Sequence, residues 1–126
     1  MNRKLSTYGK YFIEFYTGLG KDLQEKIDWV FELVKTVDFI PKKYFKHIEN
    51  SEGLYEVRIE YQSNIYRIFC FFDEGNLVIL INAFHKKSQK TPQTEIELAK
   101  KLKKLYFTDK KLNEENEKRN RKNIKK

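Results

Sequence analysis

Six basic side chains that could hold a phosphate are concentrated in the middle of the chain. They are Arg58, Arg67, His85, Lys86, Lys87 and Lys90. The two arginines fall inside strand-like apolar runs, and the other four follow a third such run. A guanidinium suits a phosphate because its planar fork can contact two oxygens at once. Grouped on a rigid sheet, these side chains could bind nucleic acid, and with an acid or base among them they could also cut it.

Arg67 carries the most weight in this group because it interrupts the apolar run I-Y-R-I-F-C-F-F at residues 65–72. A guanidinium within a central strand is costly unless it is paired or reaches water. One explanation is structural, an ion pair with Glu56 or Glu60 on the neighbouring strand. The other is functional, a clamp for phosphate on an open face of the sheet. The sequence leaves both explanations open.

The basic cluster after the third apolar run is expected to lie in a short connection between a strand and a helix. His85 is the one member whose unperturbed pKa lies near neutrality. A lysine surrounded by other cations can have a lowered pKa and act as an acid or a base. The alternative is a solvated loop with no chemical role.

A second basic segment precedes the strands, between Phe39 and Gly53, and has the character of a linker. It contains Lys42, Lys43, Lys46 and His47. These residues are candidates for RNA contacts, although a histidine in such a segment is more often an ordinary surface residue. Tyr44, Phe45 and Ile48 are expected to attach the segment to the core.

Three strands are expected to position the basic groups. Residues 55–61 alternate apolar and polar side chains, which is typical of a strand with one buried face. Residues 65–72 and 77–83 are apolar on both faces, as in central strands. The connections are short, and Gly75 suits a tight turn. The pattern therefore predicts an antiparallel meander.

The flanking elements complete an α+β fold. The aromatic stretch Tyr11–Tyr16 predicts an N-terminal strand. A helix is expected over Leu19–Thr36, with one apolar stripe formed by Leu23, Ile27, Val30, Phe31 and Val34. Thr91-Pro92 is a favourable start for a C-terminal helix. The fold class is thus a twisted antiparallel sheet, the meander plus the N-terminal strand, covered by the N-terminal helix.

Composition narrows the class of protein. The 126 residues are expected to form one domain over residues 1–108, followed by a basic tail at 109–126 that is disordered or a frayed helix. A net charge of +8 favours an anionic partner, most commonly nucleic acid. The lone Cys70 has no metal-binding spacing around it, so neither a metal nor a cofactor is expected. The sequence has no signal-peptide or membrane-spanning run, so a cytoplasmic protein is expected.

Three motifs resemble one known toxin family. They are G-L-Y-E-V-R-I at 53–59, I-Y-R-I-F at 65–69 and F-H-K-K-S-Q-K-T-P-Q-T-E-I at 84–96. Together they resemble the HigB-like, phage-related branch of the RelE/ParE superfamily, whose last motif usually reads F-x-K-K-T-Q-K-T-P-x-x-E-I. The resemblance extends from Tyr11 to Phe107. It implies a RelE-like fold and the toxin of a type II toxin–antitoxin pair.

The resemblance also implies an activity and roles for individual residues. RelE-like toxins enter the ribosomal A site and cleave mRNA by attack of a ribose 2′-hydroxyl on the adjacent phosphate, a reaction that needs no metal. Arg67 matches the arginine that stabilises the transition state, and Lys87 matches the basic residue after the last strand. Arg58 matches one of two strand lysines. Glu56 stands in place of the other, where it would act as the base or orient Arg58. His85 occupies a variable position, so its catalytic role is open.

The expected partners are mRNA, the ribosome and a helix-turn-helix antitoxin. Two alternatives remain at the level of sequence. One is a ParE-like protein that binds and inhibits DNA gyrase, sharing the fold without the catalytic cations. The other is a phage-derived RNA-binding protein with no catalytic activity.

Overall fold

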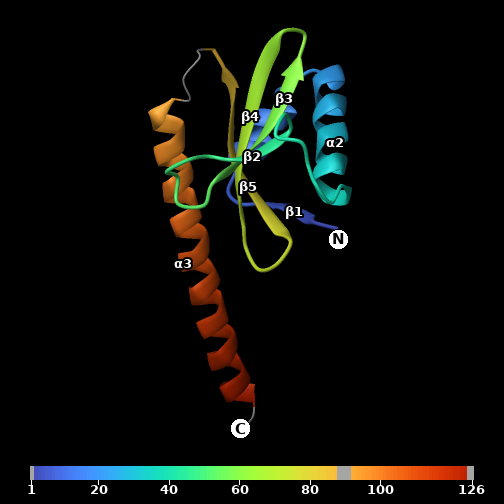
Figure 1. The fold of residues 1–126 in the computed structure, drawn as a ribbon. Coiled ribbons are helices and arrows are strands. Elements are labelled where there is room, and N and C mark those ends of the chain that lie inside the picture. The colour runs from blue at the N-terminus through green and yellow to red at the C-terminus, as the bar shows by residue number, and fades with distance from the viewer. Residues whose placement is uncertain (1, 88–91, 125–126) are drawn as a thin grey trace.

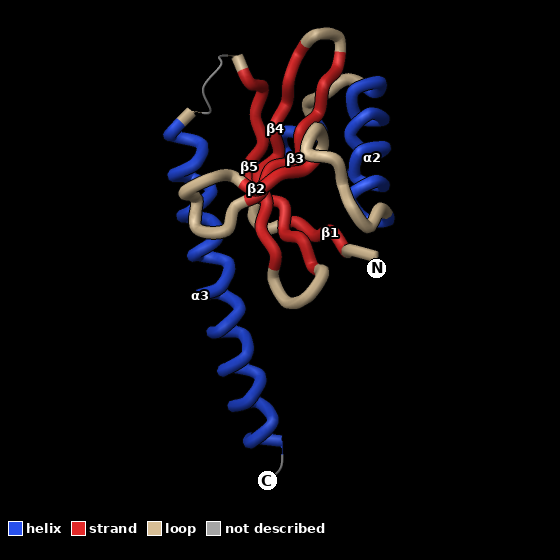
Figure 2. Tube along the Cα trace, in the orientation of Figure 1, coloured by secondary structure: helices blue, strands red, loops and turns tan. Residues whose placement is uncertain are grey.

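The computed structural model describes residues 2–87 and 92–124 and has five strands and three helices in that part of the chain (Figures 1 and 2). In chain order these elements are β1 (Lys4–Thr7), α1 (Tyr11–Thr17), α2 (Lys21–Thr36), β2 (Phe45–His47), β3 (Tyr55–Tyr61), β4 (Asn64–Phe72), β5 (Leu77–Lys86) and α3 (Gln93–Ile124). The predicted sites at Lys90 and Thr91 lie outside the described residues. The α+β class is confirmed.

The sheet is built around the predicted meander. Strands β3, β4 and β5 pair antiparallel, and β2 adds to the outer edge of β3, so that the order is β1-β5-β4-β3-β2. Strand β1 pairs with β5 in parallel, with Lys4 opposite Leu77. The sheet is therefore mixed rather than wholly antiparallel. Strand β2 also converts part of the expected linker into a sheet edge.

The predicted strand at Tyr11–Tyr16 is wrong, because this segment is helix α1. Its aromatic residues Phe12, Phe15 and Tyr16 are spaced by three and one, which places them on one face of a helix. Phe12 is buried in the core, and the other two pack against its edge. The N-terminal strand lies earlier, at Lys4–Thr7, where three of the four side chains are exposed. The aromatic composition of the segment is typical of a strand. The segment is nevertheless a helix, because a helix places its three buried or half-buried aromatic side chains on one face.

Helix α2 covers one face of the sheet, as expected, and begins two residues later than predicted. Leu23, Ile27, Val30 and Val34 are buried against Val57, Ile59 and Ile68. Phe31 is half-buried and its ring centroid lies 5.6 Å from that of Phe12. The cluster also encloses Cys70, and burial raises the pKa of its thiol far above the usual range, so it is an inert core residue.

Helix α3 packs on the opposite face, but only along part of it. Ala99 and Leu102 form a second core cluster with Phe69, Phe71 and Ile81. The helix continues beyond the sheet to Ile124, and Figure 1 shows its C-terminal half leaving the body of the protein. The backbone of the predicted basic tail is thus helical up to residue 124, while the domain boundary at 108 stays a prediction.

Polar contacts hold α3 against the body where it leaves the sheet. Tyr106 Oη donates to Asp73 Oδ2 at 2.5 Å, and Lys110 Nζ lies 2.9 Å from Asp73 Oδ1. Tyr8 Oη also donates to Asp109. Within the described ranges, none of the helices has the length and apolar character needed to cross a membrane.

Candidate active site on the uncovered sheet face

The part of the α3-facing sheet surface that α3 does not cover carries three of the predicted basic groups, Arg58, Arg67 and Lys86. Side chains alternate along a strand, so Glu56, Arg58 and Glu60 of β3 point away from the α2-facing core. Arg67 of β4 shares this face with Phe69 and Phe71, which α3 covers. The helix therefore shields the apolar half of the face and leaves the charged half open.

A buried ion pair joins Arg67 to Glu56. Arg67 Nε lies 3.0 Å from Glu56 Oε2, and the two side chains are only 8% and 1% exposed. Glu56 also forms an ion pair with Lys46 of β2, because Lys46 Nζ lies 3.5 Å from Glu56 Oε1. The structural explanation for Arg67 is therefore confirmed. This ion pair is compatible with a role for Arg67 in binding phosphate. The single negative charge of Glu56 is shared between Arg67 and Lys46, so it does not neutralise both cations.

Arg67 and Glu56 line an open pocket of about 580 Å³. Its remaining walls come from the segment that leads into and out of the edge strand β2. They include Lys42, Lys46 and His47, three of the predicted RNA contacts, together with Ile48 and Glu49. Lys43 is not in this wall, and its Nζ lies over the Tyr44 ring, 5.6 Å from the ring centroid. Strand β2 thus brings the second basic segment of the sequence beside the first.

Arg58 is half-buried beside this pair and stands directly opposite Arg67 in the strand register. Its Nη2 pairs with Glu60 Oε1 at 3.1 Å, while Glu56 pairs with Arg67 and Lys46. Its Nε is buried and has no hydrogen-bond partner among the described residues. Two guanidinium groups at opposed positions repel each other, which an anion between them would relieve.

Lys86 lies on the same face of the sheet as Arg58 and Arg67. The sequence predicts a loop at this residue. Strand β5 continues to Lys86, so residues 84–86 still alternate between the two faces. Burial lowers the pKa of Lys86, and the positive charges of Arg67 and Arg58 lower it further. The negative charge of Glu56 opposes this shift only in part. Lys86 therefore loses its proton more readily than an ordinary lysine, which makes it the candidate for proton exchange in this cluster.

His85 points to the opposite face of the sheet. Its ring stacks on Tyr66 with the centroids 4.7 Å apart, and its Nε2 lies 3.1 Å from Asn64 Oδ1. The structure therefore does not bring His85 together with Arg67. Lys87 follows the end of β5 and is exposed.

Within the described part of the chain, the cluster has more positive than negative charge. Its cations are Lys46, Arg58, Arg67 and Lys86, and its anions are Glu56 and Glu60. The cluster therefore has two more cations than anions, and the pocket beside it is lined by Lys42, Lys46 and Arg67 against Glu49 and Glu56. The described residues contain no group of three or more His, Cys, Asp or Glu side chains suited to a metal ion. The arrangement can bind a phosphodiester and stabilise additional negative charge on it.

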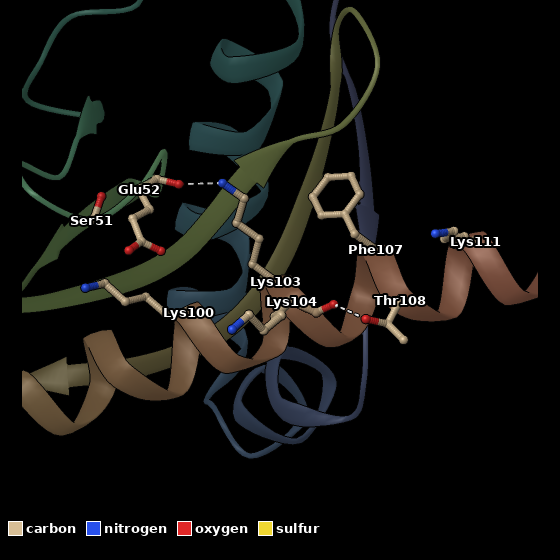
Figure 3. Close-up of a pocket in the computed structure, with 8 residues that line it drawn as sticks. All are labelled: Ser51, Glu52, Lys100, Lys103, Lys104, Phe107, Thr108 and Lys111. Carbon is tan, nitrogen blue, oxygen red and sulfur yellow. Dashed lines mark hydrogen bonds between the residues drawn. The ribbon is translucent and has the colours of Figure 1, made fainter.

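A second pocket, of about 400 Å³, lies between residues 51–52 and α3 (Figure 3). Phe107 and four lysines of α3 contribute to its wall: Lys100, Lys103, Lys104 and Lys111. Lys103 Nζ donates to the carbonyl oxygen of Glu52 at 2.5 Å, which attaches the loop to the helix. This pocket contains neither Arg67 nor Lys86, so it is not the candidate active site.

Two features of the site differ from what the sequence predicts. The pairing of Lys46 with Glu56 depends on β2, a strand that the sequence does not predict. Lys86 is expected in a loop but belongs to β5, because the alternation Phe84-His85-Lys86 continues the pattern of that strand. This alternation is the sequence signal that places Lys86 and His85 on opposite faces of the sheet.

The five-stranded sheet with its three helices is consistent with the RelE-like fold. Residues 14–104 match the family described as Phage derived protein Gp49-like (DUF891), which is a RelE/ParE-like toxin family. The chain belongs to this Gp49-like family, whose members are generally associated with toxin–antitoxin systems. Membership implies a cognate antitoxin as a partner. No curated protein matches the chain significantly.

Proposed function

We propose that this chain is a HigB-like toxin that cleaves mRNA in the ribosomal A site through a 2′-hydroxyl transesterification without a metal. The observation that carries the proposal is the Glu56–Arg67 pair in the wall of an open, cation-rich pocket. A gyrase-binding protein has no need of such a pocket. A metal-independent ribonuclease needs one to stabilise the charge of the transition state.

In the proposed reaction, the 2′-oxygen forms a bond to phosphorus and the bond between phosphorus and the 5′-oxygen breaks. The products end in a 2′,3′-cyclic phosphate and a 5′-hydroxyl. Arg67 stabilises the negative charge that develops on the phosphate oxygens, with Lys46 and Arg58 beside it. Preorganised cations are effective here because the fold has already oriented them before the charge develops.

Glu56 acts as a positioning residue in this mechanism. It is only 1% exposed and already holds Arg67 and Lys46, so it is poorly placed to take a proton from the substrate. Lys86 takes that role, because its lowered pKa gives it a larger neutral fraction than an ordinary lysine. The neutral amine accepts the 2′-hydroxyl proton, and the departing 5′-oxygen takes a proton from water.

The test is cleavage of a defined mRNA on programmed ribosomes. Arg67→Gln is expected to slow cleavage by about 10²-fold or more, the scale for loss of one preorganised charge stabiliser. The matched control is Arg3→Gln, because Arg3 lies on the N-terminal side of the molecule and bonds to the backbone of the α2 C-terminus. A folded Arg67→Gln protein that cleaves at the wild-type rate would contradict the mechanism. Arrest of replication without RNA cleavage would favour a gyrase inhibitor instead.

A further inference from the structure

We propose that Trp29 and Tyr44 form a base-stacking surface that continues the phosphate pocket around the sheet edge and binds an unpaired nucleotide of the RNA. The inference rests on the proposed function, since it takes single-stranded RNA as the ligand. The stacking surface is a second contact site for the RNA, on the α2 side of β2. It would determine the path of the RNA strand across the protein.

The stacking surface consists of two aromatic rings and two lysines. Trp29 lies on α2 and is 49% exposed, and its ring centroid is 5.8 Å from that of Tyr44 at an angle of 79°. Lys26 Nζ lies 4.8 Å from the centre of the Trp29 ring, and Lys43 Nζ lies 5.6 Å from that of Tyr44. Lys26 lies over the Trp29 ring, so a base would stack on the exposed part of the ring that Lys26 leaves uncovered, and its phosphate would pair with a lysine.

The stacking surface and the pocket share one segment of the chain, residues 42–46. Lys42 and Lys46 line the phosphate pocket, while Lys43 and Tyr44, between them in the chain, belong to the stacking surface. The backbone N–H of Arg58 donates to the carbonyl oxygen of Tyr44 at 2.9 Å. The Tyr44 ring is therefore carried by backbone that is bonded directly to a strand of the active site. Such preorganisation lowers the entropic cost of binding a flexible strand.

Charge and position favour RNA over a protein partner at this surface. Both rings are approached by lysines, and the neighbouring pocket has an excess of cations. Lys46 and Lys42 of the pocket and Lys43 beside Tyr44 lie in one short segment, so they could contact successive phosphates of a strand bound at Arg67. The second pocket has a similar composition, four lysines around Phe107, but it lies at α3 and does not include the Arg67 group. It supplies a matched control.

The first test uses the intrinsic fluorescence of Trp29, the single tryptophan of the chain. The probe is a short single-stranded RNA with 2′-O-methyl groups, which cannot be cleaved, and its abasic counterpart. We expect saturable quenching by the base-containing strand and binding without comparable quenching by the abasic strand. Binding that leaves Trp29 fully accessible to acrylamide would overturn the proposal and leave a protein partner as the occupant of this surface.

The second test measures affinity for the same labelled strand by fluorescence anisotropy. Trp29→Ala is expected to weaken binding about tenfold, Trp29→Phe to restore most of it, and Phe107→Ala to leave it unchanged. Weakening by Phe107→Ala but not by Trp29→Ala would overturn the proposal, because RNA would then follow α3. Absence of any binding at low ionic strength would overturn it as well.

The two proposals fail separately. Loss of ribosome-dependent cleavage in Arg67→Gln without any quenching of Trp29 in the wild type would reject the stacking surface and retain the nuclease. Quenching of Trp29 by RNA with no cleavage on ribosomes would retain the stacking surface and reject the nuclease.

Discussion

Arg58 and Arg67 stand directly opposite each other on β3 and β4, on the open face of the sheet. Opposed like charges are destabilising in an antiparallel pair. Glu56 and Glu60 offset the repulsion, and each of these carboxylates pairs with one of the two arginines. The relationship explains how two guanidinium groups are kept together beside a pocket, and it leads to the first prediction.

Inorganic phosphate should stabilise the protein by occupying the pocket. At roughly ten times its Kd, a ligand specific for the folded state should raise the midpoint of thermal unfolding by about 3–6 °C. Calorimetry of the wild type and Arg67→Gln at matched ionic strength checks this. Lys111→Gln, a change in the second pocket, is the control and should keep the response. An equal response in Arg67→Gln would contradict binding at this site.

Glu56→Gln should be strongly destabilising, because it leaves Arg67 buried without its carboxylate. Loss of one partner of a buried ion pair costs about 3–5 kcal/mol. The control is Glu60→Gln, since Glu60 is half exposed and its pair with Arg58 should contribute less than about 1 kcal/mol. Urea unfolding of the two variants measures the difference. Similar free energies of unfolding for both would show that Glu56 does not hold the site together.

Lys86 should give the cleavage rate a characteristic pH dependence. The folded protein lowers its pKa, and the neutral amine is the proposed base, so single-turnover cleavage should accelerate as pH rises through that lowered pKa. Lys86→Arg keeps the positive charge but cannot deprotonate, and should cleave about 10²-fold more slowly. Lys87→Arg is the neighbouring control and should retain the pH profile if Lys86 is the base. A rate that falls over this pH range would instead identify Lys86 as an acid.

The sign of the effect on stability can also be stated for Lys86. The folded state disfavours its cation, so between the folded pKa and the higher unfolded pKa the unfolded chain binds more protons. This lysine should therefore contribute a stability that increases with pH across that interval. Lys86→Gln should remove that component from the pH dependence of the free energy of unfolding.

Asp73 should make the attachment of α3 sensitive to acid. Burial alone would raise its pKa, but the contacts from Tyr106 and Lys110 outweigh that effect and lower the pKa. The carboxylate therefore contributes stability above its unfolded pKa, and this is lost as pH falls through the lowered folded pKa. Asp73→Asn should flatten the pH dependence of unfolding below about pH 5. Glu74→Gln is the control, because Glu74 is 88% exposed. Unchanged acid sensitivity in Asp73→Asn would contradict the assignment.

Local patterns in the sequence were sufficient to predict the central meander, helix α2 and the presence of a C-terminal helix. Alternation over residues 55–61 and the apolar stripe of residues 23–34 are local patterns, and each specifies its element through the face that it buries. The sequence also singled out Arg67, because a charge within a buried strand requires compensation wherever the strand lies. These features depend on neighbours close in the chain.

The remaining features depend on contacts between segments that are far apart in the chain. The short, polar segment Lys4–Thr7 forms a strand because it pairs with β5, which lies more than seventy residues later in the chain. No local sequence pattern predicts that pairing. Whether the aromatic segment 11–17 forms a helix or a strand depends on which surface it covers. The site was decided in the same way. The end of β5 places Lys86 on the face of Arg67 and His85 on the other, and the pairing of β2 with β3 brings Lys46 to Glu56. Strand register is a long-range property, because a shift of one residue moves every side chain to the opposite face.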